Sequence, residues 1–282
     1  MAGKQASVRD DPHRPGPGPA GADGELRALA LQALVVPGWA QKMAAVAAIA
    51  ADGPVDPDRI LAAPPGLPGR PERPQLVAPS QLRQRSVGTV QGRAALLHAL
   101  AHIEFNAINL ALDAVWRFAG MPVEYYRDWM RVAREEAHHF DLLRQRLQAL
   151  GHAYGDFPAH DGLWEMAQRT SGDLLARMAL VPRTLEARGL DASPAIRDKL
   201  ARAGDAEAAA ILDIILRDEI GHVAIGNRWY KWLCRARGLD PVTAYADLAR
   251  RYRAPRLKGP FNLPARRAAG FDESELQALQ AP

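Results

Sequence analysis

A seven-residue frame occurs twice in this chain and limits what the chain can fold into more than any other feature. The two copies span residues 134–140 and 217–223, and each reads Arg, acid, Glu, two residues, His, apolar. On a helix, a Glu and a His three positions apart lie on one face about a turn from each other, so both can reach a single metal ion. The repeat therefore predicts two helices that each offer a Glu-x-x-His pair.

A lone glutamate precedes each copy at nearly the same distance, Glu104 before the first and Glu186 before the second. This arrangement indicates a duplicated helical hairpin. In an antiparallel hairpin, two residues lie at one level only if they are equally far from the turn. The first turn is expected at residues 120–122, where a Gly can end one helix and a Pro can begin the next. That turn places Glu104 and Glu136 level with each other.

The second hairpin needs a later turn than its sequence first indicates. A turn at residues 189–194 would put Glu186 close to it and Glu219 far away. A turn near Gly204 restores the balance. We therefore predict a third helix that begins near residue 163, is interrupted around 189–194, resumes, and turns back near Gly204. Pro182 should bend this helix just before Glu186.

The composition favours an all-α fold, because Ala-, Leu- and Arg-rich segments predominate and β-branched runs are few. We expect a four-helix bundle with extra N-terminal helices and a C-terminal extension. The predicted divisions are a tail without fixed structure (1–23), N-terminal helices and a Pro-rich connector (24–81), the bundle (82–238), and a C-terminal helix and tail packed on it (239–282). The bundle helices should span about 90–119, 123–150, 163–203 and 205–236, followed by shorter helices at about 241–253 and 272–279.

Charge and cysteine content indicate the class of protein. The net charge of +4 permits an acidic or nucleic-acid partner without indicating one. The single cysteine, Cys234, excludes an intramolecular disulfide framework and fits a reducing compartment. We read no export signal and no apolar run approaching the ~20 residues of a membrane span, so we expect a cytoplasmic protein without a membrane partner. An exposed helical face would allow a homodimer.

Six side chains form the predicted metal site. Glu104 lies within an otherwise apolar helical stripe, where an unpaired carboxylate would be very costly to bury, and a metal is its natural partner. The predicted ligands are Glu104, Glu136, His139, Glu186, Glu219 and His222. Four carboxylates and two imidazoles inside a four-helix bundle are the ligand set of dinuclear iron or manganese proteins.

The first copy of the frame allows a second register, because Glu135 and His138 are also three residues apart. We prefer Glu136 and His139, which align with the second copy and leave an acid in the preceding position both times. His98 and His102 fall on a face away from Glu104, so both are assigned structural roles. The loop at 152–164, rich in His and aromatic residues, is interpreted as a packed connector in preference to the wall of a substrate entrance.

With these motifs, residues of about 80–265 resemble the ferritin-like superfamily, and more closely an uncharacterised bacterial family related to di-iron hydroxylases such as the tRNA-modifying hydroxylase. The resemblance implies that Glu104 and Glu186 are terminal ligands, that Glu136 and Glu219 bridge two ions, and that each ion takes one imidazole. It also implies that Glu135 and Asp218 hold the ligand imidazoles in one tautomer. The ions would be two irons, or iron with manganese.

The function that the resemblance implies is dioxygen activation, with hydroxylation or a related oxygenation of an organic substrate, and no catalytic residue beyond the metal centre. Electrons would come from an external donor, because no nucleotide- or flavin-binding signature is present. Leu143 occupies the position of the radical tyrosine in reductase relatives, which disfavours a stable radical. Pro182, Leu143 and Gly226 are expected to line a substrate pocket.

Two alternatives remain at this stage. One is an iron- or peroxide-handling protein with a binding or protective role, in which the flanking segments obstruct assembly of a storage cage. The other is a structural helical protein whose acids pair with arginines, which would not explain the repeated frame. Oxygen consumption by iron-loaded protein, with and without reductant and substrate, distinguishes the first alternative from an oxygenase.

Overall fold

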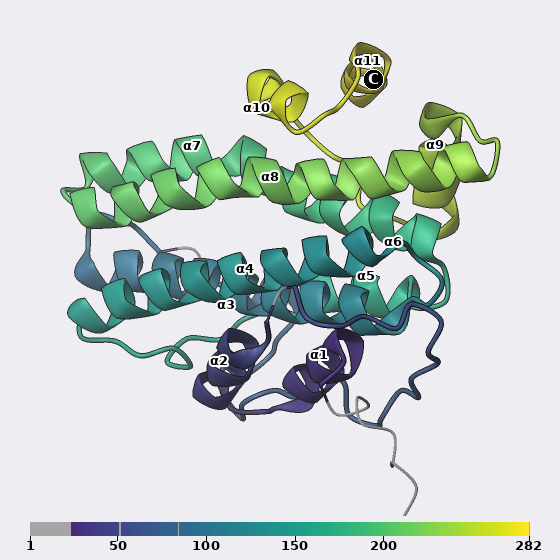
Figure 1. Cartoon of the computed structure of the whole chain (residues 1–282). Coiled ribbons are helices and arrows are strands. Elements are labelled where there is room, and N and C mark those ends of the chain that lie inside the picture. The colour runs from purple at the N-terminus through teal and green to yellow at the C-terminus, as the bar shows by residue number, and fades with distance from the viewer. Residues whose placement is uncertain (1–23, 51, 84, 282) are drawn as a thin grey trace, which may run out of the picture.

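Two long antiparallel helical hairpins lie side by side and form a four-helix bundle (Figure 1). The computed structural model describes residues 24–50, 52–83 and 85–281, and the expectation for the tail at 1–23 lies outside these residues. The bundle elements are α3 (Val90–Arg117), α4 (Val123–Ala149), the consecutive α6 (Leu174–Leu180), η2 (Val181–Glu186) and α7 (Ala187–Arg202), and α8 (Ala206–Ala236). The predicted all-α class and the bundle are confirmed.

Both hairpins turn at the predicted glycines, so that the two glutamates of each hairpin lie about equally far from its turn. Gly120 and Gly204 adopt φ angles of +78° and +81°, the left-handed conformation that favours glycine at a helix end. Asp205 then caps α8 by accepting a hydrogen bond from the Ala208 N–H. The two turns bring the midpoints of the four helices to the same level.

The expected interruption at 189–194 is wrong, because α7 continues through this stretch with Pro194 inside it. Leu190 is fully buried there, and its packing holds the helix together against the local preference of Gly and Pro. The irregularity lies earlier, in η2, which is a π-helix that contains Pro182. Proline has no N–H to donate, and the wider π turn accommodates its ring.

The third bundle helix also begins later than expected. The stretch from residue 163 forms a separate short helix, α5 (Gly162–Arg169), and residues 170–173 divide it from α6. Asp173 caps α6 by accepting a hydrogen bond from the Ala176 N–H. The single helix that was predicted to begin near residue 163 is therefore three elements, α5, α6 and η2, before α7 begins.

The flanking segments cover opposite sides of the bundle (Figure 1). Helices α1 (Leu26–Val35) and α2 (Trp39–Ala48) pack against α3 and α4, and the short 3-10 helix η1 (Pro79–Gln81) ends the connector. On the other side, α9 (Pro241–Arg251), α10 (Leu263–Ala268) and α11 (Glu273–Gln280) contact the second hairpin or each other. Helix α10 was not anticipated from the sequence.

Most residues of helix α3 are buried. Among the described residues it alone is long and apolar enough to cross a membrane by length and composition, and 72% of that apolar window is buried inside the protein. An apolar segment of this length was not expected from the sequence. Burial against α1 and α4 accounts for the apolar character of α3, and core helices of globular proteins pass the same test.

Candidate metal centre

The Glu and His residues of the repeated frame converge between the midpoints of the bundle helices. Glu104, Glu136, His139, Glu219 and His222 are all buried. Each comes from a different turn of α3, α4 or α8, and each points inward because the apolar stripe of its helix faces the core. The predicted helical spacing therefore places the Glu and the His of each repeated frame on the buried face of its helix.

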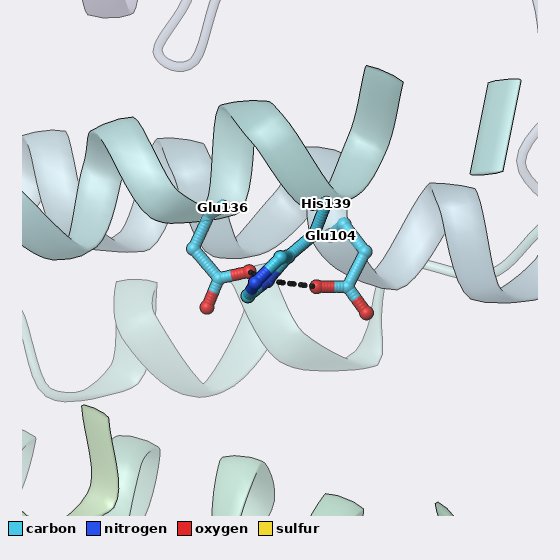
Figure 2. Close-up of side chains that lie close together, drawn as sticks. All are labelled: Glu104, Glu136 and His139. Carbon is cyan, nitrogen blue, oxygen red and sulfur yellow. Dashed lines mark hydrogen bonds and ion pairs between the residues drawn. The ribbon is translucent and has the colours of Figure 1, made fainter. Parts of the chain in front are cut away.

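The first group joins α3 to α4. Nδ1 of His139 lies 3.4 Å from Oε2 of Glu136 and 3.6 Å from Oε2 of Glu104. Figure 2 shows the His139 ring between the two carboxylates, with all three side chains directed to one point. One ligand atom from each residue lies within 4.8 Å of the other two, so the group could hold a metal ion.

The second group joins α4 to α8. Nδ1 of His222 lies 2.9 Å from Oε1 of Glu136 and 3.2 Å from Oε2 of Glu219, and these three residues could also hold a metal ion. Glu136 belongs to both groups and turns one oxygen toward each histidine. The two sites are therefore adjacent and share a carboxylate.

Each histidine is fixed from behind by the acid of the other motif. Nε2 of His139 lies 3.1 Å from Oδ2 of Asp218, and Nε2 of His222 lies 2.7 Å from Oε2 of Glu135. When Nε2–H donates to these acids, Nδ1 of each ring is left facing the carboxylates, where it can bind a cation. Spacing along the chain does not predict that each acid supports the histidine of the other hairpin.

Three of the four carboxylates, those of Glu104, Glu186 and Glu219, are poorly stabilised as anions where they lie. Burial raises the pKa of the Glu104 carboxyl, and the charge of Glu136 raises it further. Burial also raises the pKa of Glu186, with the charge of Glu219 as the second cause. The pKa of Glu219 is raised by burial in spite of its hydrogen bond with His222. A cation would remove this cost.

The histidines carry the opposing charge. Burial lowers the pKa of His139, but its hydrogen bonds to Glu104 and Glu136 outweigh burial and raise the pKa to about 11. The pKa of His222 is raised by Glu136 and Glu135 against the effect of burial. Burial would raise the pKa of Glu136, yet the charge and hydrogen bond of His222 hold it well below its usual range. Protons thus occupy the positions where a cation would bind.

Glu186, the remaining predicted ligand, lies beside these groups without belonging to either. It ends the π-helix η2, and its Oε2 is buried and lacks a hydrogen-bond partner among the described residues. The charges of Glu219 and Glu136 both act on its pKa, which places all of these carboxylates in one electrostatic environment. An orphaned buried carboxylate oxygen fits a site made for a cation.

The expected pocket near Pro182 and Gly226 is occupied by the protein itself. A Cβ on Gly226 would lie 2.5 Å from the Cβ of Pro182, so the glycine allows η2 to pack directly on α8. Leu143 is fully buried in the core. The space that the sequence attributed to a ligand is therefore a close contact between two helices.

His138, His98 and His102 all lie outside the metal centre. His138 is exposed, whereas Glu135 supports His222, so the alternative register does not bring its pair into the centre. His98 accepts a hydrogen bond from the Gly155 N–H at 2.9 Å, and His102 Nδ1 lies 2.9 Å from the Tyr154 hydroxyl. These contacts attach the loop at 152–164 to α3.

Comparison with known proteins identifies relatives of most of the chain. The family described as "Protein of unknown function (DUF455)" matches residues 32–277. A relative from Haemophilus influenzae, named "Uncharacterized protein", is 55% identical over 213 residues, which cover 73% of this chain and 74% of the relative. No solved structure matches the chain.

Proposed function

The chain belongs to the DUF455 family, and we propose that it is a ferritin-like di-metal carboxylate oxidoreductase that activates dioxygen. The metals would be two irons or iron with manganese, and the reaction a hydroxylation or related oxygenation of an organic substrate. One observation carries the proposal: Glu136 is shared by two buried groups, each with a second glutamate and a histidine. Adjacent sites with a common carboxylate are suited to a pair of ions acting together.

The donor set fits iron or manganese better than zinc. Carboxylates and imidazoles suit hard and borderline divalent ions, and the buried Cys234 is the only thiol in the sequence. Glu104 and His139 would hold one ion, Glu219 and His222 the other, and Glu136 would bridge them. Glu186 would serve as the terminal carboxylate of the second ion. Bound ions of this kind supply Lewis acidity and redox chemistry.

The protein would contribute geometry and a dry interior. Asp218 and Glu135 hold the Nε2 protons of His139 and His222, which keeps each ring in one orientation and one tautomer. Burial of His139, His222 and Glu136 keeps bulk water away from the centre. Reducing equivalents would come from a separate donor, because the sequence has no flavin- or nucleotide-binding signature.

Metal analysis of iron-loaded protein tests the centre. The wild type should hold two ions per chain, Glu136→Ala should lose both, and Glu219→Ala should lose one. Glu124→Ala, an exposed glutamate on the same helix as Glu136, is the matched control and should retain two ions. Retention of two ions by Glu136→Ala would contradict the shared-ligand arrangement.

Oxygen consumption then tests the reaction. With a reductant and candidate organic substrates, turnover should continue beyond the amount of dioxygen needed to oxidise the bound metal. Uptake that stops once the metal is oxidised, whatever reductant or substrate is added, would favour the alternative of an iron- or peroxide-handling protein.

A further inference from the structure

A cavity lies against the outer face of α3, away from the metal centre. Its volume is about 390 Å³, and its walls are residues 81–83 and 85, helix α3, residues 157–160, and Leu163 at the start of α5. Asn106 lines it, and at the helical angle per residue Asn106 is roughly 200° around α3 from Glu104. The helix therefore stands between this cavity and the metal centre, so a ligand here would not contact the metals.

The charge at this cavity is positive and unbalanced. Arg83 and Arg85 both line it, and none of the described lining residues is acidic. Neither guanidinium has an ion pair or a hydrogen bond with any residue that the structure describes; Arg85 lies 5.5 Å over the ring of Phe157. Two guanidinium groups that have no carboxylate partner are suited to bind the carboxylate, sulfonate or phosphate group of a ligand.

The floor of the cavity is built from buried polar groups. Asn106 is only 2% exposed, and its Nδ2 donates to the His102 carbonyl at 3.0 Å and lies 2.9 Å from Nε2 of His102. These contacts fix the amide, and its Oδ1 has no hydrogen-bond partner within the described part of the chain. Burial lowers the pKa of His102 to about 4, so the ring is neutral and the positive charge belongs to the arginines.

Much of the remaining wall is apolar, although Gln81 and His160 also line it. Ala95, Ala99, Leu163 and Phe157 belong to the apolar part. The side chains of Ala95 and Ala99 on α3 are small, which leaves room for the apolar body of a ligand. The cavity thus combines apolar side chains, the fixed amide of Asn106 and the two cationic side chains of Arg83 and Arg85.

We propose that this cavity is a binding site for an organic anion with an apolar body. The acidic group lies between Arg83 and Arg85, and the body packs against α3 and Phe157. The site is separate from the metal centre and does not depend on its function.

Two fluorescent probes that differ only in one acidic group test this site. Anilinonaphthalene sulfonate carries the anion, and phenylnaphthylamine is the same body without it. The Arg83→Gln/Arg85→Gln variant should weaken sulfonate binding at least tenfold and leave the neutral probe unaffected. Arg235→Gln/Arg237→Gln removes two exposed arginines at the same spacing near the end of α8, and this matched control should bind both probes as the wild type does.

A cavity-filling variant adds an independent readout. Ala99→Trp should exclude both probes while leaving the thermal unfolding midpoint close to that of the wild type, because Ala99 is exposed on α3. Equal sulfonate affinity in the wild type and the Arg83/Arg85 variant would overturn the proposal. So would an equal loss in the Arg235/Arg237 control, because that result would mean a general effect of net charge.

Discussion

Asp218 of α8 holds His139 of α4 through a 3.1 Å contact between Oδ2 and Nε2, so the acid of one motif orients the ligand of the other. Glu135 does the same for His222 in the reverse direction. The two hairpins are thereby coupled at the metal centre by a reciprocal pair of contacts. This relationship makes the acid before each Glu-x-x-His pair a testable part of the site.

Asp218→Asn should lower metal affinity about 10- to 100-fold, because a neutral amide oxygen accepts more weakly from Nε2–H than a carboxylate does, so the ring of His139 is held less firmly and is less basic. The measurement is competition with a chromogenic chelator. Asp213→Asn is the control, because Asp213 lies on the same helix and, among the described residues, pairs only with the partly exposed Arg197. An equal loss of affinity in the two variants would refute a specific role for Asp218.

Metal binding should release protons. The pKa of His139 is raised to about 11 without a metal, so its ring is protonated at neutral pH and must lose a proton before Nδ1 can bind a cation. Affinity should therefore rise with pH across the neutral range. Titration calorimetry in two buffers of different ionisation enthalpy measures the number of protons released; identical heats in both buffers would contradict the expectation.

Glu186→Gln should make metal-free protein less sensitive to pH. Because the folded-state pKa of Glu186 is raised, the carboxyl favours folding at low pH, and that contribution is lost as pH rises from the unfolded value through the folded one. The wild type should lose stability over this interval more steeply than the variant. Denaturant unfolding across a pH series measures the difference, and parallel curves would show that Glu186 is well solvated.

The same Glu186→Gln variant should also gain less stability from added metal. The amide is a weaker ligand than a carboxylate, so the stabilisation that bound ions give the folded state falls. Thermal melts with and without iron or manganese provide the comparison. An unchanged metal-induced shift would remove Glu186 from the ligand set.

Gly226→Ala should destabilise the protein by about 1–3 kcal/mol, because the added Cβ meets the ring of Pro182, which cannot rotate away. The displaced η2 should also disturb Glu186 and reduce metal binding. Gly221→Ala on the same helix meets nothing within 4 Å and should be stabilising by about 0.5–1 kcal/mol. Chemical denaturation of both variants is the measurement, and equal effects would contradict the close contact.

The sequence by itself determined the turns of the two hairpins and the candidate ligands, because both depend on local sequence. A Glu and a His three apart share a helix face in any context, and Gly120 and Gly204 end helices through their own backbone freedom. These properties are set within a few turns of chain.

Only the tertiary structure decided what depends on contacts between helices. The crossing of Asp218 to His139, the sharing of Glu136 and the filling of the Gly226 gap by Pro182 all join residues far apart in the chain. The continuity of α7 past Pro194 has the same origin, since packing around Leu190 outweighs the local preference for a break. Periodicity gives the face of a helix, but packing decides which residues that face meets.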